Sequence, residues 1–82
     1  MSEADRLFEE LGYEVWYTDN YANIHELQSE YKDRKNNVLI AFYGDKTFKK
    51  MYEGIVGAVM PPNITMQELK AINAYVEEHG WE

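Results

Sequence analysis

The chain has 82 residues and is 45% hydrophobic and 15% aromatic, which suits one small folded domain over residues 1–82 and excludes a disordered chain. Its formal net charge of −7 disfavours binding to bulk nucleic acid, and the lack of cysteine excludes disulfides and thiolate metal sites. No run approaches the roughly 18 apolar residues of a membrane span, and the acidic, polar start is unlike a secretory signal. We therefore expect a soluble cytoplasmic protein that does not enter a membrane.

Residues 2–11 are predicted to form an amphipathic helix. The i, i+3, i+4, i+7 spacing of one helical face is filled by Ala4, Leu7, Phe8 and Leu11. Ser2 suits the N-cap, and Gly12 suits the stop because glycine readily adopts the left-handed backbone that ends many helices. The phrase Phe8–Tyr13 reads apolar, Glu, Glu, any residue, Gly, aromatic, and it returns at Val76–Trp81. We expect two helix stops of the same kind, each with an aromatic residue folded back onto the last turn.

After the first helix the pattern becomes that of strands. Val15–Tyr17 is either a short strand or an ordered loop. Residues 27–31 alternate apolar or small with polar side chains, which predicts a half-exposed strand, and the polar stretch from Asp33 to Asn37 predicts a turn.

The strongest strand signal follows. Val38–Tyr43 is a continuous apolar run with β-branched and aromatic residues, and it is the best candidate for a central strand. Gly44–Lys46 makes a short turn into Thr47–Tyr52, so the two runs predict a hairpin. Ile55–Met60 is a weaker candidate for an edge strand, because glycines and the following prolines oppose it.

The closing helix has the clearest start. Thr65 and Glu68 form a capping box, and Ile64 with Leu69 forms a hydrophobic staple. Gly80 is expected to end this helix after about 13–15 residues. Its buried stripe is predicted to comprise Leu69, Ile72 and Val76, with Met66 and Tyr75 beside them.

The order of elements predicts an α+β fold, in which a three- to four-stranded antiparallel sheet is flanked by an N-terminal and a C-terminal helix, both packed on one sheet face. Pairing the hairpin assigns the more apolar set to the core: Val38, Ile40, Phe42, Phe48 and Tyr52. The other face is then expected to be open and to carry Leu39, Ala41, Tyr43, Thr47, Lys49 and Met51. That face is either a partner or self-association surface or an ordinary outer face covered by residues 55–60.

The sequence does not space its acidic residues and histidines as known catalytic motifs do. The adjacent carboxylates Glu9-Glu10 and Glu77-Glu78 diverge on a helix and predict a solvated face. His25 and His79 lack the spacing of metal ligands or a catalytic triad. Phosphate-binding glycine loops and nucleophile motifs are absent as well. We expect a protein that is not an enzyme and that holds no cofactor and no metal.

Aromatic and charged residues give the candidate binding sites. Trp16, Tyr17 and Tyr21 are the aromatic residues least explained by helix or central-strand packing, so they are binding candidates, with anchoring of a loop or core as the alternative. The candidates on the sheet face are Leu39, Tyr43, Lys49 and Met51.

Charge is spread unevenly along the chain. Six of the eight basic residues lie between Lys32 and Lys50, where two acids oppose them, and the other thirteen acids lie elsewhere. With nearby aromatics this basic stretch suggests a base-stacking sheet, but the net charge favours charged turns that guard sheet edges.

Both ends of the chain carry a family likeness. Ala4–Tyr13 (ADRLFEELGY) and Ile64–Asn73 (ITMQELKAIN), with Gly80-Trp81 beyond it, resemble a group of small uncharacterised proteins encoded by phages and prophages of Gram-positive bacteria. The likeness covers the two helices, roughly a third of the chain, and not the middle. It implies a phage accessory protein acting in the cytoplasm of the host cell, with no catalytic residue to carry over. By analogy, such proteins bind host or defence proteins, as anti-CRISPR-type inhibitors do.

Three hypotheses follow. The first is a non-enzymatic protein that binds and modulates a host or defence protein with a basic surface. The second is a self-associating structural domain, a homodimer through the outer sheet face. The third, which the net charge disfavours, is a nucleic-acid-binding sheet.

Overall fold

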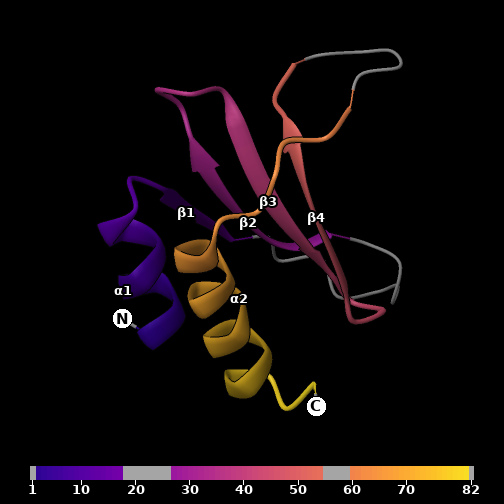
Figure 1. The fold of residues 1–82 in the computed structure, drawn as a ribbon. Coiled ribbons are helices and arrows are strands. Elements are labelled where there is room, and N and C mark those ends of the chain that lie inside the picture. The colour runs from indigo at the N-terminus through magenta and orange to yellow at the C-terminus, as the bar shows by residue number, and fades with distance from the viewer. Residues whose placement is uncertain (1, 18–26, 55–59, 82) are drawn as a thin grey trace.

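A computed structural model describes residues 2–17, 27–54 and 60–81. In chain order the elements are α1 (Glu3–Glu10), β1 (Glu14–Tyr17), β2 (Leu27–Asp33), β3 (Val38–Tyr43), β4 (Thr47–Tyr52) and α2 (Met66–Glu78). The strands lie in the sheet in the order β1-β2-β3-β4, each antiparallel to its neighbour. The two helices lie together on one side of this sheet (Figure 1), so the predicted α+β fold is confirmed.

Both helices end in the same hydrogen-bonded turn. At the end of α1 the Gly12 N–H donates to Glu9 O and the Tyr13 N–H donates to Phe8 O, both at 3.0 Å. This is the Schellman pattern, and it requires the left-handed backbone that Gly12 supplies at φ +95°. The same pair of bonds closes α2, from Gly80 to Glu77 (3.2 Å) and from Trp81 to Val76 (3.0 Å). The repeated phrase in the sequence therefore encodes two equivalent helix stops.

The start of α2 also agrees with its sequence. The Thr65 side chain accepts from Glu68 N at 3.0 Å, while the Glu68 carboxylate accepts from Thr65 N at 2.9 Å, which completes the capping box. The helix covers 13 residues, within the expected length.

The middle of the chain forms a meander. Val15–Tyr17, which the sequence left open between strand and loop, belongs to β1 and pairs with β2. The β3–β4 hairpin has the predicted register, with Phe42 opposite Phe48 and Leu39 opposite Met51. Of the Ile55–Met60 candidate strand, residues 55–59 lie outside the described residues, and Met60 lies outside any strand.

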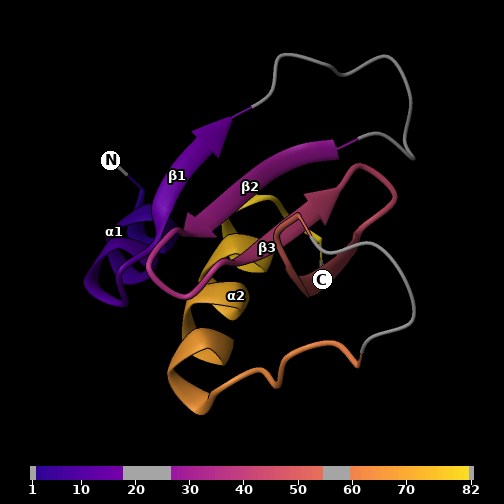
Figure 2. The ribbon, with the colours of Figure 1, turned by 90° about the horizontal axis from the view of Figure 1, so that it is seen from above.

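The core between the two layers is largely aromatic. Phe8 of α1 stacks on Tyr31 of β2 with ring centroids 3.9 Å apart, and Tyr75 of α2 stacks on Phe42 of β3 at 3.8 Å. Seen from above, α1 lies toward β1 and α2 crosses beneath β2 and β3 (Figure 2). The layer of two helices is therefore centred on the first three strands.

This placement corrects part of the predicted core. Phe48 and Tyr52 lie on the predicted face, but they are 39% and 38% exposed, because α2 reaches β4 only through Glu68 and Lys50. On α2 the buried residues are Glu68, Ala71, Ile72 and Tyr75, whereas Leu69 and Met66 are exposed. The helix is thus rotated relative to the stripe that hydrophobicity alone suggested.

On the other face of the sheet, some residues that were expected to be exposed are buried. Leu39 and Ala41 point away from the helices, yet only 7% and 1% of their surfaces are exposed. Tyr43 and Met51 are half-buried. The face expected to be open therefore has a buried centre along β3.

Candidate binding surface

The sheet gathers most of the predicted binding residues on the face opposite the helices. Antiparallel pairing puts Trp16, Glu30, Ala41 and Lys49 in one cross-strand row, and Glu14, Lys32, Leu39 and Met51 in the next. Residues directly opposite each other in such rows point to the same face. Five of the seven candidates thus come together from strands far apart in sequence: Trp16, Leu39, Tyr43, Lys49 and Met51. We call this surface the outer face.

The accessible part of the outer face lies around its buried centre. Trp16 on β1 is 42% exposed and Lys49 on β4 is exposed. Leu39 is buried, so it supports the surface from below and is not a contact residue itself. Its 7% exposure corrects its assignment as an exposed candidate.

The last two candidates are not placed on this surface. Tyr17 lies in β1 opposite Ser29, and Ser29 is a position on the helix side of the sheet, because it pairs with Phe42. The side chain of Tyr17 and the whole of Tyr21 lie outside the described residues.

Cations cover the aromatic ring at one side of the outer face. The Lys32 ammonium lies 4.7 Å and the Arg34 guanidinium 5.3 Å from the centroid of Trp16. Lys32 also pairs with Glu53, and Arg34 with Glu14, both at 3.2 Å. These contacts fix the indole of Trp16 on the surface without leaving a strong net charge beside it.

Two charges of the same row are left without an ion pair within the described residues. Glu30 on β2 and Lys49 on β4 lie on either side of Ala41. The Lys49 ammonium lies 5.4 Å from the ring centroid of Tyr43. The centre of the outer face therefore offers one acid and one base at opposite sides of an apolar strand.

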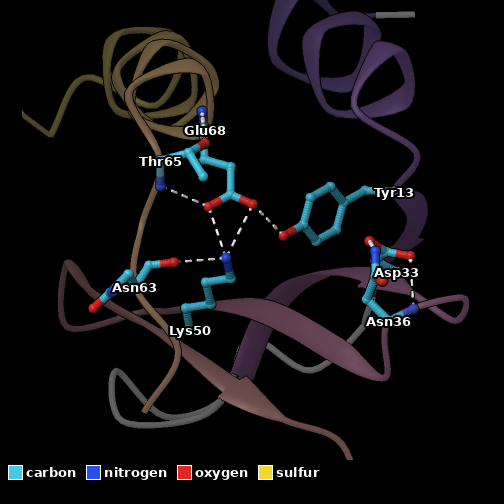
Figure 3. Close-up of polar contacts among 7 residues, drawn as sticks. All are labelled: Tyr13, Asp33, Asn36, Lys50, Asn63, Thr65 and Glu68. Atoms are coloured by element: carbon cyan, nitrogen blue, oxygen red, sulfur yellow. Dashed lines mark hydrogen bonds and ion pairs between the residues drawn. The ribbon is translucent and has the colours of Figure 1, made fainter.

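A buried polar network on the helix side of the sheet was not expected from the sequence. The Glu68 carboxylate accepts hydrogen bonds from the Tyr13 hydroxyl at 2.6 Å and from the Lys50 ammonium at 2.8 and 3.1 Å (Figure 3). Lys50 also donates to Asn63 O at 2.7 Å. Only 9% of each side chain of the Lys50–Glu68 pair is exposed. The network joins β4, the chain before α2, α2 itself and Tyr13, which lies between α1 and β1.

The pKa values of this network follow from burial and hydrogen bonding. Burial pushes the pKa of the Glu68 carboxyl upward, but hydrogen bonds from Lys50, Tyr13 and the Thr65 backbone outweigh it and hold the pKa below its ordinary value. Burial also raises the pKa of the Tyr13 hydroxyl far above its ordinary value, and the adjacent Glu68 carboxylate raises it further.

This network is suited to holding the fold rather than to catalysis. Both oxygens of Glu68 already accept two hydrogen bonds each, from Thr65 and Lys50 on one side and from Tyr13 and Lys50 on the other. A general base needs a free lone pair and access to substrate, and Glu68 offers neither. The capping box predicted Glu68 at N3, but contacts across 18 and 55 residues of sequence cannot be read from local pattern.

Other polar groups have similar structural roles. Asp33 accepts from Asn36 at the turn before β3, at 2.7 Å from the side chain and 3.3 Å from the backbone (Figure 3). His79 stacks on Tyr75 at 3.9 Å, and its Nδ1 lies 2.9 Å from Tyr75 O, which agrees with a role at the end of α2. His25 lies outside the described residues. Nowhere in the described part of the chain do three potential metal ligands come together.

The paired carboxylates lie on the helical layer. Glu10 pairs with Arg6, and Glu78 accepts from the Ala4 N–H at 2.9 Å. A groove of about 330 Å³ between the helices is open and lined by Leu7, Glu10, Leu11, Gln67 and Lys70. Its lining brings together no group with a catalytic partner.

Comparisons of the chain with models of protein families, with curated proteins and with solved structures gave no match. Among the described residues, neither helix is both long and apolar enough to cross a lipid bilayer. The geometry of the chain itself therefore carries the functional argument.

Proposed function

We propose that this protein is a non-enzymatic binding protein, a phage-type accessory protein that engages and modulates a host or defence protein in the cytoplasm of the host cell. The outer face is its contact surface, with Trp16, Tyr43, Lys49 and Met51 as contact residues. The net charge of −7 steers it toward a partner with a basic surface.

The observation that supports this proposal is the exposed indole of Trp16. Tryptophan is among the residues that contribute most to binding when an interface buries it. Here the indole is 42% exposed, yet it is held in place by Lys32 and Arg34, so little further ordering is needed on binding. Glu30, which has no ion pair within the described residues, offers one acid beside it to a basic partner.

The test is a capture experiment from Gram-positive host lysate at low salt, with wild-type protein and two matched variants. Trp16→Ala removes the indole from the outer face, whereas Met66→Ala shortens a side chain that is 76% exposed on α2. We expect a specific partner with wild type and Met66→Ala, and its loss with Trp16→Ala and at high salt. If no partner is retained at low salt, or if Trp16→Ala retains the same partner, the proposal is wrong.

A second candidate function is self-association through the outer face. It is favoured by Glu30 and Lys49, which flank β3 in one row. Stacking two copies about a two-fold axis along β3 would put Glu30 of one copy over Lys49 of the other. Light scattering would show a dimer that Lys49→Glu disrupts and that mixing Lys49→Glu with Glu30→Lys restores. A monomer at high concentration would exclude this candidate.

Binding of nucleic acid has the weakest support. Of the six basic residues between Lys32 and Lys50, three are in ion pairs within the described residues, namely Lys32, Arg34 and Lys50. Fewer cations are then left to neutralise phosphates. A titration with RNA at moderate salt that shows no binding would end this alternative.

A further inference from the structure

The fourth strand is the side of the sheet that the helices cover least, with Phe48 and Tyr52 partly exposed on either side of Lys50, of whose side chain only 9% is exposed. Among the residues that the structure describes, β4 is an edge strand, because it pairs with β3 and with no other strand. The helices stack on β2 and β3 through Phe8 and Tyr75. In Figure 1 both helices lie toward β1 to β3, and α2 reaches β4 through the Glu68–Lys50 ion pair. An edge strand presents backbone N–H and C=O groups at every second residue that no neighbouring strand has paired.

An apolar strip runs along the helix-side surface of this edge. Phe48 and Tyr52 of β4 are 39% and 38% exposed, and Leu69 of α2 is 38% exposed. Gln67 and Lys70 line the groove toward α1. Leu69 is about 100–200° around the helix from them, so it lies on the side of α2 away from α1, next to Glu68, which contacts Lys50 of β4. The Lys50–Glu68 ion pair and the Lys50–Asn63 bond tie the two sides of the strip together beneath it.

Large exposed hydrophobic side chains are concentrated in two stretches of the described chain. Of its seven large hydrophobic side chains that are exposed, Trp16 alone lies on the outer face. The other six belong to β4 or to residues 60–69, namely Phe48, Tyr52, Met60, Ile64, Met66 and Leu69. Such a concentration marks an interaction surface more strongly than scattered exposed residues do.

The opposite side of the same edge is positively charged. Lys49 points to the outer face and Lys46 lies in the hairpin turn, and both are exposed without an ion pair within the described residues. The edge of β4 is therefore apolar toward the helices and cationic away from them. A second copy of this edge would bring lysines toward lysines, which disfavours it as the occupant.

We propose that the edge of β4 accepts, as a fifth strand, an extended segment of a partner protein in which apolar and acidic residues alternate. Successive side chains of a strand point to opposite faces, so the apolar residues would pack over Phe48, Tyr52 and Leu69 while the acidic residues face Lys49. The backbone of the segment would pair with the free edge of β4. This site does not depend on Trp16, which lies on the other edge strand.

The test uses ¹⁵N-labelled wild-type protein and capped eight-residue peptides, observed by NMR. The probe alternates valine and glutamate, and its matched control alternates valine and lysine. We expect the valine–glutamate peptide to shift the amides of β4 with a dissociation constant below about 1 mM, and the lysine peptide to bind at least about threefold more weakly. Equal binding of the two peptides, or no shift of β4 amides, would overturn the proposal.

Two further measurements keep the backbone and charge contributions distinct. In one variant of the valine–glutamate peptide all valines are N-methylated, and in a second variant all glutamates are. Because alternate N–H groups point to opposite edges of a strand, one of these two variants should lose binding and the other should keep it. Lys49→Glu should reverse the preference between the glutamate and lysine peptides, whereas Lys70→Glu, on the α1 side of α2, should not. If neither methylated peptide loses affinity, or if Lys49→Glu leaves the preference unchanged, strand addition at β4 is refuted. Trp16→Ala should bind the peptide as wild type does, so failure of the outer-face proposal is distinguishable from failure of this one.

Discussion

Removal of the Lys50 ammonium gives the sharpest test of what holds the two layers together. Lys50→Met keeps the length and most of the apolar stem of the side chain. It removes the cation that donates to both oxygens of Glu68 and to Asn63 O. The Glu68 carboxylate would then be buried with only the Tyr13 hydroxyl and the Thr65 N–H as donors.

The size of the effect follows from the burial of the pair. With 9% of each side chain exposed, the pair is little screened by water. Removing one partner of a buried pair costs about 3–5 kcal/mol of unfolding free energy, and the two remaining donors reduce this to about 2–4 kcal/mol. A domain of this length has a total stability of about 4–12 kcal/mol, so the loss is a large fraction of it. Lys49→Met, at the exposed neighbouring position, should change stability by less than about 0.5 kcal/mol.

Urea unfolding followed by circular dichroism at about pH 7 and about pH 4 measures both the loss and its cause. In Lys50→Met the burial of Glu68 is no longer offset by the ammonium, so the pKa of its carboxyl rises and the carboxyl takes up a proton more readily as pH falls. The difference between wild type and Lys50→Met should therefore shrink as pH falls. A loss below about 1 kcal/mol at pH 7, or a loss equal to that of Lys49→Met, would refute this reasoning.

Three other predictions concern Glu68, Tyr13 and the glycines that end the two helices. The pKa of Glu68 is lowered in the folded protein, so its contribution to stability is fully present above the ordinary glutamate pKa and is lost as pH falls through the lowered value. Glu68→Gln should flatten this part of the stability–pH curve, and an unchanged curve would contradict the prediction. Burial and the Glu68 carboxylate raise the pKa of Tyr13, so absorbance titration should show its hydroxyl resisting ionisation above about pH 10, and the stability of the protein should fall as pH rises beyond that value. A tyrosine that titrates normally in the wild-type protein and is missing from Tyr13→Phe would count against the network. Gly80→Asn should cost less unfolding free energy than Gly12→Asn, because φ is +64° at Gly80, within the range that asparagine tolerates, and +95° at Gly12. At neither position would a Cβ meet an atom within 4 Å, so the difference should come from the backbone conformation. Equal losses would show that another factor determines the cost.

Local signals were sufficient for the elements themselves. Caps, glycine stops and the turn residues act over a few positions, so α1, the capping box at Thr65 and the β3–β4 hairpin were all predictable from sequence. The register of that hairpin was predictable too, because a period of two and a short loop leave few alternatives. Strand β1 was left open because four residues give too short a pattern to distinguish a strand from a loop.

The candidate binding surface was only partly predictable. The outer-face set on β3 and β4 followed from the hairpin register, but its union with Trp16 required the pairing of β1 with β2. That pairing spans residues 18–26, and the turn predicted at Thr18-Asp19-Asn20 does not fix the register across so long a connection. The buried network of Glu68 was missed because Tyr13 and Lys50 reach it from distant parts of the chain.

The sequence by itself therefore determined where each helix begins and ends, that Val38–Tyr43 and Thr47–Tyr52 form a hairpin, and which of their residues share a face. These properties depend on backbone conformation and side-chain alternation over a few residues. The tertiary structure alone decided that Phe48 and Tyr52 of β4 stay partly exposed, that Leu69 is exposed, and that Leu39 and Ala41 are buried on the outer face. Such outcomes depend on how two layers of unequal width pack together, and aromatic stacking between Phe8 and Tyr31 and between Tyr75 and Phe42 fixes that arrangement.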